Sequence, residues 1–208
     1  MVYITHSGEN AEKINAIQKA AQIRFGLHGL EKTTMKEIAS DLGMSKASMY
    51  YYFPDKEGLF KAVVEMESDE FFHEIERTQE QINDPALMLK EYIRLRLKYF
   101  KTLFNLSRLR VEEFRFMKPI LTDTLNEFRR REEELVMSLI ISGIEKGLFQ
   151  VENPLEVAIL FVEAVKGLRL QLIHKKELFY IEPEEFKSLE IKLNLFTDIF
   201  IRGLARKD

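Results

Sequence analysis

Apolar residues recur at intervals of three and four along most of this chain, a spacing that predicts amphipathic helices. About nine helices are expected. They cover residues 9–28, 34–42, 45–53, 55–81, 85–104, 108–117, 122–146, 154–173 and 183–203. Prolines and glycines stand where these segments begin or end, and Pro119 is expected to separate two of them. The pattern predicts an all-α protein.

The segment from Thr34 to Pro54 carries the clearest local signals. Thr34 and Glu37 have the spacing of a capping box, in which each side chain bonds to the other residue's backbone at the start of a helix. Gly43 ends that helix in a sharp turn, and Ser45 caps the next one. Two helices joined by a tight glycine-containing turn are typical of a helix-turn-helix.

The second helix of this pair is expected to present a nearly uncharged surface. At about 100° per residue, Met49 and Phe53 face inward, and the other side carries small residues and tyrosines. From Met44 to Pro54 the only charged residue is Lys46, so no acid repels a phosphate. The pattern favours a recognition helix in a DNA major groove. The alternative is that the tyrosines pack within a small helical domain.

A wider set of residues resembles the amino-terminal signature of the TetR family of transcriptional repressors. The matching positions are Ala20-Ala21, Phe25, Gly29, Thr33-Thr34, Ile38-Ala39, Gly43, Ser45, Ser48, Tyr50 to Phe53 and Lys56-Glu57. The resemblance implies a DNA-binding domain over 9–65, followed by a helical ligand-binding and dimerisation domain over 66–208. It implies phosphate contacts from Thr34, Lys56 and Tyr50, and groove contacts from Lys46, Ala47, Ser48 and Tyr52, with Tyr51 on the same outward surface.

Composition limits the other possibilities. The chain has 208 residues, 46% of them hydrophobic, and a net charge of −3, so attraction to DNA must come from local placement of charge. It contains no cysteine, which excludes disulfides and zinc-thiolate sites, and no cofactor is expected. The amino-terminal residues lack the pattern of a signal peptide, so the expected location is the cytoplasm.

The last two helices contain more apolar residues than one small body can cover. The segment 157–173 is apolar nearly all round except at Glu163, which is expected to find a buried partner or to contact a ligand. The final helix repeats apolar residues from Phe186 to Phe200. We expect a two-fold homodimer in which each chain contributes both helices to a four-helix seam. Such a dimer would read a palindromic operator.

Aromatic residues concentrate in the body, which can hold either a plain core or a ligand cavity. The resemblance implies the cavity and hence a repressor that a small apolar or amphipathic ligand releases from DNA. The candidate lining residues are Tyr92, Arg96, Tyr99, Phe100, Phe104, Phe114, Phe128 and Glu163. One alternative is a DNA-binding adaptor controlled by a partner protein, with a filled core. A helical metalloenzyme is the other, but Glu70 and His73 form the only E-x-x-H pair, so an enzyme is not expected.

Overall fold

The computed structural model describes residues 5–102, 111–173 and 182–206, and these residues contain eight helices. The helices are α1 (Thr5–His28), α2 (Met35–Asp41), α3 (Lys46–Tyr52), α4 (Lys56–Gln79), α5 (Pro85–Thr102), α6 (Val111–Glu145), α7 (Pro154–Ile173) and α8 (Pro183–Leu204). The fold is therefore all-α, as the spacing of apolar residues predicts.

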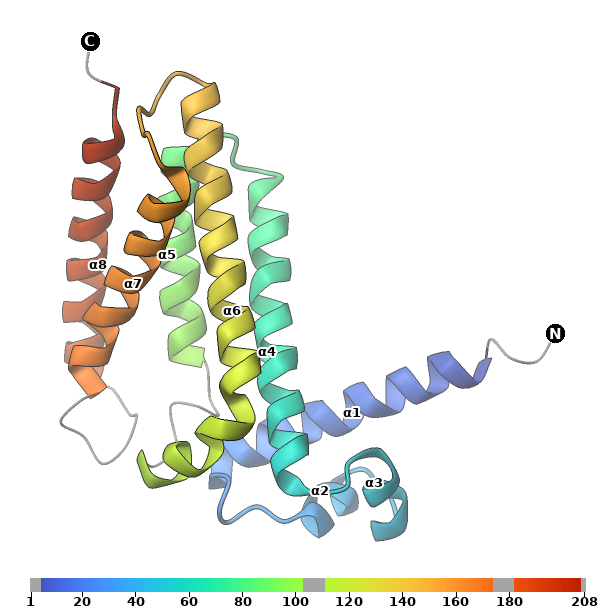
Figure 1. The fold of residues 1–208 in the computed structure, drawn as a ribbon. Helices are drawn as coiled ribbons and strands as arrows, with labels where there is room; N and C mark the ends of the chain where they lie inside the picture. Colours follow the sequence, from blue (N-terminus) through green and yellow to red (C-terminus); the bar gives the residue numbers. More distant parts are fainter. Residues whose placement is uncertain (1–4, 103–110, 174–181, 207–208) are drawn as a thin grey trace.

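The helices form a long body with a small unit at one end (Figure 1). Helices α4 to α8 run along the body, while α2 and α3 lie at the foot of α4 and α1 crosses beside it. Since α4 extends from the small unit into the body, it connects the two. In the described part of the chain, no helix is long and apolar enough to cross a membrane.

Two hydrophobic cores hold this arrangement together. The first contains Ile17, Phe25, Ile38 and Met49 from α1 to α3, together with the start of α4. The second fills the body between α4 and α8. Burial of apolar side chains contributes about 1.5–3 kcal/mol for each large residue, so each core is a substantial source of stability.

The signals at helix ends act as the sequence predicts. Asp55 caps α4 by accepting a hydrogen bond of 2.6 Å from Gly58 N, and Asp84 caps α5 through Ala86 N at 2.8 Å. Gly147 follows α6 with a φ of +70°, a backbone conformation that glycine adopts without strain. The predicted rod after Asp55 is confirmed as α4, which ends at Gln79.

The expectation that Pro119 separates two helices is wrong. Pro119 lies inside the 35-residue helix α6, so the described residues contain eight helices where about nine were predicted. Proline removes one backbone hydrogen bond and crowds the preceding turn, which bends a helix without always ending it. The amino-terminal part of α6 turns away from the axis of the remainder (Figure 1). The bend directs Met117 and Leu121 into the first core, where both are fully buried.

Helices α7 and α8 each have a buried side and an exposed apolar side. On α8, Leu189 and Leu193 face the body core, and Phe196 lies 5.4 Å from the Phe161 ring of α7. A second apolar stripe points away from the body and remains exposed. Its members on α8 are Ile191, Leu195 and Ile199, which are 60%, 59% and 61% exposed.

Candidate nucleic-acid interface and body cavities

Helices α2 and α3 form the predicted helix-turn-helix, and their caps are present. Thr34 Oγ1 accepts a hydrogen bond from Glu37 N, and the Glu37 carboxylate accepts one of 2.8 Å from Thr34 N, which completes the capping box. Gly43 has a φ of +61° in the turn. Ser45 Oγ then caps α3 by accepting a hydrogen bond of 3.1 Å from Ser48 N.

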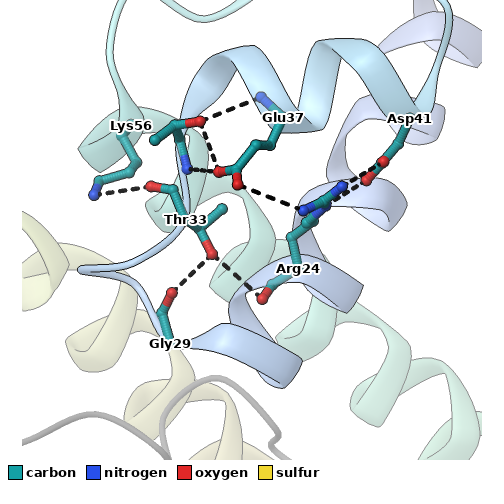
Figure 2. Close-up of polar contacts among 7 residues, drawn as sticks. Arg24, Gly29, Thr33, Glu37, Asp41 and Lys56 are labelled. Atoms are coloured by element: carbon teal, nitrogen blue, oxygen red, sulfur yellow. Dashed lines mark hydrogen bonds and ion pairs between the residues drawn. The ribbon is translucent and has the colours of Figure 1, made fainter.

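Side chains of α1 fix the position of α2 (Figure 2). Arg24 donates two hydrogen bonds of 2.6 Å to the Asp41 carboxylate and lies 3.8 Å from Glu37. This hydrogen bonding holds the pKa of Asp41 below its usual value, and hydrogen bonds from Thr34 do the same for the pKa of Glu37. The buried Thr33 hydroxyl donates to the carbonyl oxygen of Gly29, just after α1, at 2.8 Å, and lies 3.3 Å from that of Arg24 in α1. These contacts hold α2 against α1.

Lys56, the first residue of α4, ties α4 to the loop between α1 and α2. Its ammonium donates to the carbonyl oxygens of Leu30 at 2.7 Å and Thr33 at 3.1 Å, with a longer contact of 3.4 Å to Glu31. Figure 2 shows the bond to Thr33. An ammonium has three N–H donors, and all three are used here. The structure thus gives Lys56 a role in positioning the loop, beside the phosphate contact that the resemblance implies.

The surface of α3 divides as the helical spacing predicts. Met49 is fully buried, whereas Lys46 and Ala47 are exposed, Tyr50 is 40% exposed and Tyr51 is 79% exposed. Lys46 places its ammonium 5.6 Å from the centre of the Tyr50 ring. The alternative in which the tyrosines pack within the domain does not fit Tyr51.

Three other candidate DNA-binding residues are partly buried or already hydrogen-bonded within the protein. Ser48 and Tyr52 are half-buried, and the Tyr52 hydroxyl donates to Asn10 Oδ1 of α1 at 3.3 Å. The Thr34 hydroxyl is exposed, but it donates to Glu37 at 2.7 Å. These three residues border the exposed surface of α3 that Lys46 and Tyr51 occupy.

Comparisons with known proteins identify this arrangement. Residues 17–63 match the model of the bacterial regulatory proteins of the tetR family. The HTH-type transcriptional regulator RutR of Escherichia coli K12 is 31% identical over 142 residues, covering 68% of this chain and 66% of that protein, just under two thirds of its length. A transcriptional regulator from Cytophaga hutchinsonii is 37% identical, with a TM-score of 0.86, over 93% of this chain and 99% of that one. The chain belongs to the TetR family.

TetR-family proteins are DNA-binding transcriptional regulators and not enzymes, so the helix-turn-helix is the DNA-binding element of this chain. The TetR fold extends over the whole body. A protein from Saccharomonospora viridis, solved in complex with choline, has a TM-score of 0.70 over 95% of this chain and all of that one, at 18% identity. That likeness concerns the fold alone.

A group of buried polar side chains crosses the body of this TetR-family protein. Glu132 of α6 accepts hydrogen bonds from Arg96 Nε at 2.5 Å and from the Tyr92 hydroxyl at 2.6 Å. The Arg96 guanidinium also lies 4.8 Å from the centre of the Phe128 ring. Burial, and then the negative charge of Glu132, raise the pKa of Tyr92 well above its usual value. Tyr92 therefore stays protonated and donates to the carboxylate.

Arg169 of α7 is a second cation in this group, half-buried as a residue but with a buried Nε, and no ligand role was predicted for it from the sequence. Its guanidinium lies 4.8 Å from the centre of the Phe100 ring. Burial, and then repulsion from Arg96, lower its pKa to about 10. A signal was present in the sequence, because Arg169 follows Phe161, Val162 and Val165 at helical spacing and so shares their buried side.

Two small cavities adjoin the Arg96 and Arg169 guanidiniums. The larger, of about 70 Å³, also has Tyr99 and Phe128 in its wall, and the smaller, of about 20 Å³, has Phe100. The structure thus brings four of the predicted ligand residues together. Tyr92 is fully buried behind them.

Of the other three ligand candidates, Glu163 lines neither cavity, and the structure does not describe the side chains of the remaining two. Glu163 is exposed in the single chain, so the expected buried partner or ligand contact is not found there. Its helical position explains this, because it shares the outward side of α7 with Leu160, which is 62% exposed. Phe104 lies outside the described residues, as does the side chain of Phe114 in α6. Glu70 and His73, the E-x-x-H pair, are both exposed, and Glu70 pairs with Lys19.

Proposed function

We propose that this TetR-family regulator is a homodimeric repressor that binds a palindromic operator and leaves it when a small ligand enters the body. The proposal is based mainly on the surface of α3, which carries one cation, Lys46, and exposed tyrosines but no acidic residue. The two parts of the chain, residues 9–65 and 66–208, take the DNA-binding and the ligand-binding and dimerisation roles.

The DNA contacts follow from exposure on α3. Lys46, Tyr50 and Tyr51 have groups free to reach the backbone and the base edges, and Ala47 and Ser48 allow close approach. Thr34 and Tyr52 flank this surface. Lys56 holds the loop behind it, and we assign it this positioning role, because the phosphate contact that the resemblance implies would require at least one of its three carbonyl bonds to open.

The operator can be found by selecting bound fragments from random DNA. We expect a palindrome whose half-sites are about one helical turn apart, because a two-fold dimer presents two α3 helices. Tyr51→Ala should weaken binding to the selected site without lowering the melting temperature, since its ring is largely exposed. If the selected sequences have no two-fold symmetry, the proposal that a dimer binds the operator is contradicted.

The exposed stripe of Ile191, Leu195 and Ile199 supports the dimer. These residues are spaced by four on α8, and each exposes about 60% of its surface in the single chain. Exposed apolar stripes of this kind mark protein–protein contacts. A second copy of the stripe, related by a two-fold axis, would cover them together with Leu160 of α7.

A substitution on this stripe tests the dimer. Leu195→Asp should convert the protein to a monomer in sedimentation equilibrium and reduce operator affinity. Leu87→Asp is the matched control, because Leu87 is similarly exposed, at 55%, on α5. If Leu195→Asp remains as dimeric as the control, the proposed seam is wrong.

The ligand role is supported by the position of the two cavities, which lie where Tyr99, Phe100 and Phe128 meet the buried arginines. A protein of the same fold was solved in complex with choline, which is consistent with a small-molecule ligand. Cavities of about 70 and 20 Å³ are smaller than a typical ligand pocket of about 300 Å³ or more, so a ligand must move side chains or helices as it enters. That movement is the expected source of release from DNA.

The DNA-binding adaptor remains the competing function. Its body would respond to a partner protein, and the small cavities favour it more than a large open pocket would. Titration of the protein–operator complex with small molecules separates the two. Release by a small molecule supports the repressor, and an unchanged operator affinity across a broad set of compounds supports the adaptor.

A further inference from the structure

The charges beside the two cavities do not balance. Arg96 and Arg169 bring two positive charges to both cavities, and Glu132 of the smaller cavity brings one negative charge and pairs with Arg96. The smaller cavity also has Lys166 in its wall, but Lys166 is exposed to solvent. Within the described residues, Arg96 Nη1 and Arg169 Nε are buried and have no hydrogen-bond partner. Glu67 is also buried, but it accepts a hydrogen bond from Gln22 of α1 and lines a different hollow with Glu70 and Lys98. One guanidinium charge is therefore left without a counterion.

An unpaired buried charge is costly, because the low-dielectric interior replaces its water without supplying an opposite charge. Nearly every buried cation in a protein is paired or bound to a ligand. The aromatic ring of Phe100 offsets part of the cost at Arg169 but supplies no hydrogen-bond acceptor. The free N–H groups of the two arginines are thus suited to an anion that enters from outside.

The larger cavity gives that anion an apolar neighbourhood. Its wall contains Val64 and Ser68 of α4, Leu125 and Phe128 of α6, and the two arginines. Val64 and Leu125 belong to the core of the DNA-binding unit, while Phe128 packs against the body core. The cavity therefore lies at the junction of the two cores.

We propose that Arg96 and Arg169 together bind the carboxylate of a small amphipathic acid, whose apolar part lies in the cavity between α4 and α6. The proposal rests on the ligand-released function and specifies the chemical class of the ligand. At the larger cavity the only charged lining residues are the two arginines, and Glu132, which pairs with Arg96, reduces their formal charge to +1, which a monovalent carboxylate neutralises and a dianion exceeds. Carboxylates also match the planar arrangement of guanidinium donors.

The position of the cavity explains how such an acid acts on DNA binding. An apolar group larger than the cavity of about 70 Å³ must separate Val64 on α4 from Leu125 on α6. Helix α4 carries Lys56, which is bonded to the loop in front of α2. A shift of α4 therefore moves the helix-turn-helix with it, and the acid favours the arrangement that does not bind the operator.

Paired probes of equal shape and different charge test the proposal. Benzoate and decanoate are compared with benzyl alcohol and decanol, and with choline, by thermal shift and calorimetry on the full chain. We expect the two acids to raise the melting temperature and the alcohols and choline to leave it unchanged. Arg169→Met should bind the acids about 10- to 100-fold more weakly, the effect of losing charge-assisted hydrogen bonds. Arg129→Met, which removes an exposed arginine of α6, should bind them like the parent.

The unliganded Arg169→Met protein provides a second measurement. It should melt at the same temperature as the parent or higher, because the substitution removes an uncompensated charge and keeps the apolar volume. A clearly lower melting temperature would show that Arg169 already has a stabilising partner and would overturn the proposal. So would equal binding of acids and alcohols to the parent protein, a comparison that depends on no variant.

Operator affinity, measured with the same probes, separates this proposal from the ligand-released function. If the acids bind through Arg169 and operator affinity is unchanged, the carboxylate site is supported and release from DNA by a ligand is contradicted. If choline or an alcohol releases the protein from DNA and the acids do not bind, release by a ligand is supported and the carboxylate site is contradicted.

Discussion

The same substitution at two lysines ten residues apart should affect different properties, the melting temperature at one lysine and the salt dependence of operator binding at the other. Lys56 of α4 donates to carbonyl oxygens at 2.7, 3.1 and 3.4 Å, whereas Lys46 of α3 is exposed, with its ammonium 5.6 Å from the centre of the Tyr50 ring. Replacing either with methionine removes the charge and keeps most of the side-chain length. The matched pair therefore separates a structural lysine from a DNA-binding one.

The magnitude for Lys56→Met follows from its two shorter bonds. Hydrogen bonds to a charged group are worth about 1.5–3 kcal/mol each when buried, and the half-exposed position reduces the sum to about 1–2 kcal/mol. In a chain of this size, 1 kcal/mol corresponds to about 2–4 °C, so the melting temperature should fall by about 2–8 °C. Lys46→Met should change it by less than about 2 °C, as surface substitutions usually do.

Operator binding at several salt concentrations provides the second half of the assay. Loss of one lysine–phosphate contact reduces the slope of log K against log salt by about 0.9. We expect this reduction for Lys46→Met. For Lys56→Met we expect weaker binding with the same slope, because the loop loses its position and no phosphate contact is lost. An unchanged melting temperature together with a reduced slope for Lys56→Met would refute the structural role and support the phosphate contact.

Two further substitutions probe packing and charge. In Gly143→Ala, the added Cβ would lie 2.0 Å from the Phe149 ring, so thermal unfolding should show a loss of about 1–3 kcal/mol, and an unchanged stability would mean that the ring moves freely. Arg24→Met should raise the pKa of Asp41, measured by carboxyl NMR titration, because Arg24 holds that pKa below its usual value. A group with a lowered folded pKa stabilises the protein above its unfolded pKa of about 4 and loses that contribution as the pH falls through the folded value. The stability difference between Arg24→Met and the parent should therefore shrink below about pH 4, and a difference that stays constant would exclude this ion pair as its cause.

Local sequence rules were sufficient for the helix-turn-helix. The Thr34–Glu37 capping box, the turn at Gly43 and the Ser45 cap each depend on residues no more than four positions apart, and the structure contains all three. The same rules placed Met49 inward and Tyr51 outward. They failed at Pro119, because whether a proline ends a helix or bends it depends on what its neighbours pack against.

The pairings between distant segments were decided by the tertiary structure alone. The Arg96–Glu132 bond joins residues 36 positions apart, and the bond from Lys56 to Leu30 spans 26 positions. Helical periodicity gives the side of a helix on which a residue lies, but not which other helix covers that side. That is why Glu163 seemed in sequence to be the exceptional charge of α7, while packing left it exposed and enclosed Arg169 beside Arg96. The sequence by itself determined the DNA-binding element, and the packing of α4 to α8 decided where the charges of the body meet.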